Sequence, residues 1–195
     1  MEFKVARPAL LVHGLSSDPT IWNNWLPKFN ELGLNSVVLN NNEPIVVKTV
    51  PIMKVAGCGT IQDNAEGLKS EIDRIREELK VDKINLIGHS KGGLDSRFVA
   101  QEYEKYISQI IQIGTPNGGS EWADLPPSWL PDWARPCLEP ITNQLRPVSM
   151  RTFNQSFFFP VTILNTLYSR GIILPHLLLF QETMILLYQL ILLTL

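Results

Sequence analysis

The sequence is poor in the residues that mark several classes of protein. Its 195 residues include two cysteines, Cys58 and Cys137, too few for a disulfide framework; either one bridge or two unpaired thiols would fit. The net charge of −2 and the lack of a lysine- or arginine-rich run argue against a nucleic-acid surface. The first residues do not resemble a signal peptide, so we expect an intracellular protein or the mature form of an exported one. The length fits one domain with a sizeable core.

What the sequence does contain is a serine between glycines. Ser90 lies in the segment Gly88-His89-Ser90-Lys91-Gly92, directly after the apolar run Ile84–Ile87 and before a helical pattern. The spacing G-x-S-x-G is that of a nucleophile elbow, a sharp strand-to-helix turn that presents a serine hydroxyl. Side chains at Gly88 and Gly92 would collide in so tight a turn, which explains both glycines.

Apolar runs and helical stripes alternate along the first 113 residues. The apolar runs predict strands over 9–12, 36–39, 84–87 and 109–113. Helices are expected from about Thr20 to Leu32, over 61–79 and from the elbow to about Tyr106, with a loop over 40–44. Buried strands alternating with helices predict an α/β fold in which helices cover both faces of a mostly parallel sheet.

The chemistry of a serine nucleophile requires further groups. A base must take the hydroxyl proton, a carboxylate must orient that base, and backbone N–H groups must hold the oxyanion. We expect the N–H groups of Lys91 and of Leu15, in the loop after the first strand, to form the oxyanion hole; the alternative for His13-Gly14 is a plain strand-ending turn. His89 cannot reach around to act as the base, so we interpret it as a packed or hydrogen-bonded residue.

Three segments resemble bacterial triacylglycerol lipases and esterases of the α/β-hydrolase family. They are His13-Gly14, the elbow 88–93, and residues 114–124 with the sequence GTPNGGSEWAD, and the resemblance extends over about 7–156. It implies a carboxylic ester hydrolase that acts on acyl lipids or similar esters through an acyl-enzyme at Ser90. It implies no cofactor; some relatives bind a structural calcium, but no ligand set is evident. Many relatives are secreted, and a membrane or lipid interface is compatible with the resemblance.

The resemblance also predicts how the chain is divided. We expect a hydrolase core over 1–160 with a lid insertion at about 117–150, a stretch rich in proline that holds Trp122, Trp129 and Trp133. The alternative for this stretch is a packed surface excursion. Residues 161–195 differ in composition, with 12 leucines against 15 in the first 160 residues, and we interpret them as an aberrant apolar tail.

This tail does not supply the partners that the resemblance implies. In the family the order is Ser, Asp, His, but here the one histidine after Ser90 is His176, and the one carboxylate beyond Glu139 is Glu182, which follows it. His176 is therefore a candidate base that lacks its acid. We expect that the chain lacks its catalytic Asp and His and has little hydrolase activity.

We interpret the tail as a product of a shifted reading frame. Read one base earlier, the codons allowed for residues 180–194 are compatible with the string PGNDDITVSVDSAY, which resembles the acid-bearing loop of the family. A membrane-anchoring tail stays open as an alternative, although a span needs about 20 apolar residues. Two other functions also stay open: an acyltransferase or thioesterase that uses Ser90, and a non-catalytic hydrolase-like domain tethered to a membrane. Acyl length and oligomeric state are not predicted.

Overall fold

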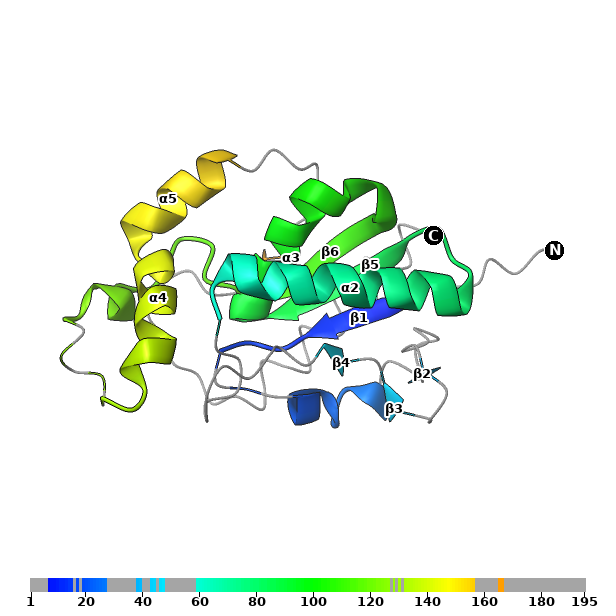
Figure 1. Cartoon of the computed structure of the whole chain (residues 1–195), viewed down its shortest axis with the longest axis horizontal. Helices are drawn as coiled ribbons and strands as arrows, with labels where there is room; N and C mark the ends of the chain where they lie inside the picture. Colours follow the sequence, from blue (N-terminus) through cyan, green and yellow to red (C-terminus); the bar gives the residue numbers. More distant parts are fainter. Residues whose placement is uncertain are drawn as a thin grey trace.

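A parallel sheet forms the centre of the molecule (Figure 1). The computed structural model describes residues 7–15, 17, 19–27, 38–39, 43–44, 46–47, 59–126, 128, 130, 132–156 and 165–166. Five strands lie in the order β4-β1-β5-β6-β7, and every neighbouring pair is parallel. Their bounds are Val46–Val47 for β4, Ala9–Val12 for β1, Ile84–His89 for β5, Ile107–Ile113 for β6 and Asn165–Thr166 for β7. The predicted parallel α/β sheet is confirmed.

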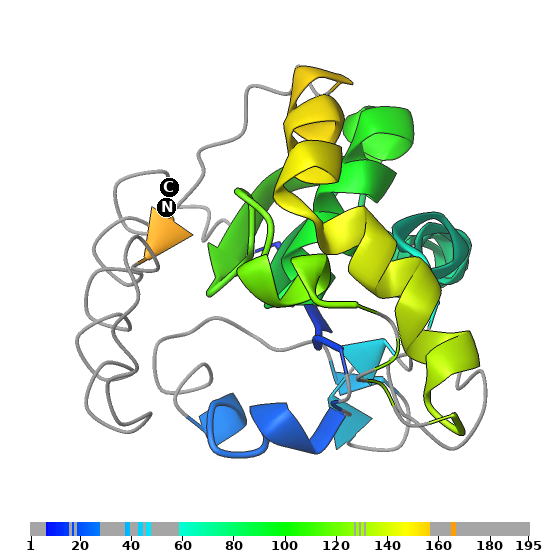
Figure 2. The ribbon, with the colours of Figure 1, turned by 90° about the vertical axis from the view of Figure 1, so that its left-hand side faces the viewer.

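Alternate residues of the central strands point to opposite faces of the sheet, as a period of two requires. Leu10 and Leu86 pack on the face covered by α2 (Ile61–Leu79) and α3 (Lys91–Tyr103), whereas Leu11 and Ile87 pack on the other face with Trp22. Figure 2 shows the short helix η1 (Pro19–Trp22) on the side of the sheet opposite α2 and α3. Both faces are therefore covered, which explains why apolar residues occur on both faces of these strands.

Helix α2 follows the predicted bounds, and its sequence explains where it begins and ends. The Thr60 hydroxyl accepts a hydrogen bond from the Asp63 N–H, and the Asp63 carboxylate accepts one from the Thr60 N–H, which completes a capping box. Lys80 ends the helix in the left-handed conformation. The predicted apolar stripe is buried except at its last member, Leu79, which is exposed.

Two differences from the sequence predictions lie between residues 20 and 44. The helix expected from Thr20 is described only to residue 27, and it begins as the 3-10 helix η1, held by i→i+3 bonds such as that from the Asn23 N–H to the Thr20 carbonyl. The loop expected over 40–44 ends in strand β3 (Glu43–Pro44), which pairs antiparallel with β2 (Val38–Leu39). Proline is tolerated in such a strand when it lies at an edge.

The segment after β6 folds into short helices that pack on the body of the molecule. These are η3 (Glu121–Asp124), α4 (Arg135–Leu145) and α5 (Pro147–Ser156), and α4 and α5 lie beyond the carboxyl ends of β1 and β5 (Figure 1). Their buried apolar side chains form one cluster with two residues of α2 and α3; its members are Ile61, Leu94, Ala123, Ile141, Leu145 and Met150. Large apolar side chains stay exposed on the same segment: Trp122, Leu125, Trp133 and Val148.

The tail beyond residue 156 is described only at 165–166, so the predicted change of character at 161–195 lies outside the described residues, as does Cys58. Within the described part of the chain, no helix is long and apolar enough to cross a membrane.

Candidate active site

Ser90 occupies a strained turn between β5 and α3. Its backbone dihedrals are φ 53° and ψ −127°, and among the described non-glycine residues only Lys80 also has a positive φ. The turn is held by hydrogen bonds from the Ser90 N–H to the Ile113 carbonyl (2.8 Å) and from the Gly93 N–H to the Ser90 carbonyl (3.1 Å). A non-glycine residue persists in such a conformation only where its surroundings enforce it, and such residues cluster at functional sites.

The glycines around Ser90 allow the backbone to pack without side chains. A Cβ at Gly88 would lie 2.5 Å from the Gly93 Cα, and a Cβ at Gly92 would lie 2.4 Å from the Val12 carbonyl oxygen. These separations are far below van der Waals contact. The first turn of α3 therefore lies directly against β5 and the end of β1.

The loop after β1 lies beside the serine. A Cβ on Gly14 would be 2.7 Å from the Ser90 Cβ and 3.2 Å from its Oγ, so no side chain fits between this loop and Ser90. The next residue, Leu15, is the expected second oxyanion donor. Lys91 is the first residue of α3, so its N–H has no acceptor within the helix and lies at the positive end of the helix dipole. The backbone of Gly14, directly before Leu15, and that of Lys91 thus lie beside Ser90, and Leu15 stays the predicted second donor.

Two of the three histidines of the sequence are described. The buried His13 has its Nδ1 3.0 Å from the Gly14 carbonyl oxygen, so a proton on Nδ1 is donated to that oxygen. The ring of His89 packs edge-on against Trp22, at 6.5 Å between centroids, and the interpretation of His89 as a packed residue is confirmed. His176, the candidate base, lies outside the described residues.

A buried ion pair lies in α3, which the sequence reasoning did not find. The Lys91 Nζ is 2.7 Å from the Asp95 Oδ1, and the Asn64 amide of α2 donates to Asp95 Oδ2 at 2.9 Å. Burial raises the pKa of the Asp95 carboxyl, and the Lys91 ammonium and the Asn64 amide oppose that rise. The signal for this pair in the sequence is a lysine and an aspartate four residues apart on a predicted helix.

A second polar network joins the elbow to α5. The Gln112 amide donates to the Gly93 carbonyl (2.9 Å), and the Asn117 amide donates to the Gln112 Oε1 (3.0 Å). The Arg97 guanidinium donates to the Oδ1 atoms of Asn117 (2.6 Å) and Asn154 (2.9 Å), and burial lowers its pKa. The loop after β6 and helix α5 are thereby fixed to α3.

Within the described ranges, no group of three or more histidine, cysteine, aspartate or glutamate side chains is placed so that it could hold a metal ion.

The sequence matches the α/β-hydrolase fold family over residues 7–170, which is most of the chain. The chain belongs to the α/β-hydrolase family. This finding agrees with the parallel sheet and with the strand-turn-helix at Ser90.

Curated relatives of this α/β hydrolase include triacylglycerol lipases. It is 31% identical to one from Pseudomonas fragi over 117 residues, which is 60% of this chain and 37% of that lipase. It is 42% identical to one from Pseudarthrobacter phenanthrenivorans over 59 residues, which is 30% of this chain and 18% of that lipase. The matches thus span between 18% and 37% of the length of these relatives.

Solved structures agree on the fold. The mature form of lipase BlEst2 from Bacillus licheniformis superposes with a TM-score of 0.56 at 22% identity, over 80% of this chain and 61% of that one. Phospholipase PlaB from Legionella pneumophila gives 0.53 at 21% identity, over 77% of this chain and 35% of that one. At such identities the likeness is one of architecture.

Proposed function

We propose that this α/β hydrolase is a serine carboxylic ester hydrolase that acts on acyl lipids or similar esters. The observation that carries the proposal is the positive φ of Ser90 at a strand-to-helix turn, with the backbone of Gly14 and of Lys91 beside its hydroxyl. The triacylglycerol lipases among the relatives support the choice of an ester substrate.

The geometry supports a two-step displacement. In the first step the Ser90 Oγ forms a bond to the ester carbonyl carbon, and the oxyanion accepts hydrogen bonds from the N–H groups of Leu15 and Lys91. The bond to the leaving alkoxide breaks, the alcohol departs with the proton taken from Ser90, and an acyl-enzyme remains. Water then attacks the acyl carbon, which releases the acid and restores the hydroxyl. A histidine and a carboxylate would carry the proton in both steps; His176 is the candidate base from this chain.

The first test is the reactivity of Ser90. A fluorophosphonate probe should form an Oγ–phosphorus bond at Ser90, with release of fluoride and the hydroxyl proton, and Ser90→Ala should carry no label. Peptide mass spectrometry locates the label, and the exposed Ser128→Ala serves as control. A native chain that is labelled no faster than the same chain in denaturant would overturn the proposal.

The predicted frame shift sets the rate expected in this test. The 195-residue chain should react slowly, because the oxyanion hole and substrate binding alone leave residual catalysis when triad members are missing. A chain whose codons after 156 are read in the other frame should react faster, and its label should depend on Ser90 in the same way. Equal rates from the two chains would count against the shifted frame and leave the role of Ser90 standing.

The exposed apolar side chains beyond β6 supply the argument for a lipid substrate. Trp122 is 71% and Trp133 is 68% exposed, on the segment that lies beyond the carboxyl ends of β1 and β5. Large apolar side chains on a surface are typical of sites that contact lipid or protein.

Trp133→Ser should lower the ratio of long-chain to short-chain p-nitrophenyl ester turnover several-fold, because an exposed indole is lost from the acyl-binding side. The same substitution should leave the thermal midpoint within about 2 °C of the parent, since little buried area changes. Ser128→Ala is the control on the same segment. An unchanged chain-length ratio would reduce the proposal to an esterase without lipid preference.

A further inference from the structure

The side chain of Lys91 is buried directly behind the proposed nucleophile, where a charged group is costly. Lys91 is 1% exposed and Asp95 is 1% exposed, and the two face each other across one turn of α3. Burying two charges is seldom favourable for stability, because the loss of hydration offsets most of their attraction. The buried pair is therefore explained better by the position in which it holds the Lys91 backbone than by any gain in stability.

What it fixes is the turn that carries an oxyanion donor. The N–H of Lys91 is the proposed donor, and the same residue's Nζ is held 2.7 Å from Asp95 Oδ1, one helical turn later. Asp95 is held in turn by the Asn64 amide of α2 at 2.9 Å. Lys91, whose N–H is the proposed donor, is thus linked through its Nζ and Asp95 to Asn64 of helix α2.

One further carboxylate interacts electrostatically with Lys91. Asp63, at the start of α2, also feels the charge of Lys91, but its carboxylate is engaged by Thr60 in the capping box. Of the acidic groups on the two helices, Asp95 is the one that contacts the Lys91 ammonium directly. The network therefore consists of Lys91, Asp95 and Asn64.

We propose that the Lys91–Asp95 ion pair, braced by Asn64, is a positioning device that orients the Lys91 N–H toward the oxyanion formed at Ser90. The proposal rests on the proposed function and adds to it a role for three side chains. Positioning of a reacting group within a fraction of an ångström changes rates strongly, whereas it need not change affinity for the ground state.

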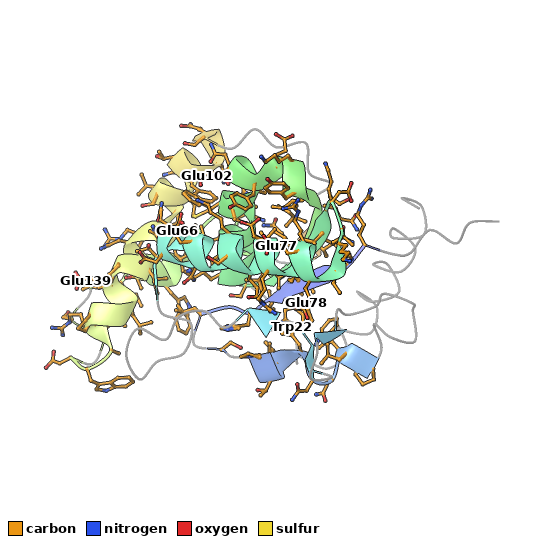
Figure 3. All side chains as sticks on the ribbon, turned by 45° about the vertical axis from the view of Figure 1, so that its right-hand side comes forward. Trp22, Glu66, Glu77, Glu78, Glu102 and Glu139 are labelled. Carbon is orange, nitrogen blue, oxygen red and sulfur yellow. The ribbon has the colours of Figure 1, made fainter. Side chains whose placement is uncertain are left out.

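The test uses the fluorophosphonate probe, whose phosphoryl oxygen takes the position of the oxyanion. The limiting rate constant of labelling, kinact, and the probe concentration at half-saturation, KI, are measured for the 195-residue chain and for its variants. Lys91→Met removes the cation, and Lys91→Met with Asp95→Leu replaces both charges by apolar groups of similar size. Lys69→Met is the matched control, because Lys69 pairs with Glu66 of α2 and with Glu102 near the C-terminal end of α3, whereas the elbow adjoins the N-terminal end of α3. Figure 3 labels both glutamates.

We expect kinact to fall about 10-fold or more in both Lys91 variants, with KI unchanged. The double variant should keep a thermal midpoint close to that of the parent, because it leaves no charge buried alone. Should the Lys91 variants fail to fold, Asn64→Leu keeps both charges, removes only the brace from α2, and should lower kinact about 3-fold. Lys69→Met should leave kinact unchanged.

Two results overturn the proposal, and they are distinguishable. If the folded double variant, or folded Asn64→Leu, is labelled at the parent's kinact, the pair is merely structural and the proposed function stands. If the parent chain carries no label at Ser90, the proposed function fails and the positioning role falls with it.

Discussion

Replacing Gly88 with alanine should unfold the protein or lower its free energy of unfolding by at least about 3 kcal/mol. The added Cβ would lie 2.5 to 2.6 Å from the backbone of Gly92 and Gly93, and backbone atoms cannot move aside as the end of a flexible side chain can. To remove this steric overlap, the first turn of α3 would have to move away from β5, which would break the packing around Ser90. Chemical denaturation followed by tryptophan fluorescence measures the change.

The chain offers a matched control for this substitution. Gly67 lies inside α2, and a Cβ there would meet nothing within 4 Å. Gly67→Ala should therefore raise the free energy of unfolding by about 0.5–1 kcal/mol, since alanine favours a helix more than glycine does. If Gly88→Ala and Gly67→Ala had the same effect on stability, the close packing described for the elbow would be wrong.

Gly14→Ala should slow the labelling of Ser90 by about 100-fold or more, which is the usual cost of losing one oxyanion donor. The new methyl group would lie 2.7 Å from the Ser90 Cβ and 3.2 Å from its Oγ, so the loop that carries Leu15 must shift or the hydroxyl must turn away. The measurement is kinact for the fluorophosphonate, corrected for the folded fraction.

Gly118→Ala is the control for this change, because a Cβ there meets no atom within 4 Å although the residue also lies in a loop after a strand. It should leave kinact unchanged. A Gly14→Ala protein that stays folded and reacts at the parent's rate would show that the loop after β1 is no part of the oxyanion hole.

Much of the fold follows from short-range signals in the sequence. In the runs Ala9–Val12 and Ile84–Ile87 every position except Asn85 is apolar, because both faces of the sheet are covered, and the 61–79 stripe has the period of a helix packed on one side. Strands β4 and β7, of two residues each, were not predicted, because they are defined by pairing with β1 and β6 rather than by their own composition.

The site was predictable where it depends on adjacent residues. The spacing of Gly88, Ser90 and Gly92 indicates the elbow, because the turn imposes its own residue types. The burial of the Lys91 side chain was not predictable, since it depends on Asn64 of α2, which is adjacent only in the folded chain. The acid and base stay predictions, because His176 and the tail around it lie outside the described residues.

The hydrogen-bonded chain from Gly93 to Asn154 has a consequence for protein engineering. Two of its members, Asn117 and Asn154, flank the stretch that holds η3 and α4, and both accept hydrogen bonds from Arg97 of α3. These two anchor points lie outside the stretch, whereas Ala123, Ile141 and Leu145 within it pack with Ile61 and Leu94. A chimera could exchange 121–147 for the corresponding stretch of another hydrolase and still attach it through the same guanidinium, so that substrate preference changes while the nucleophile keeps its support.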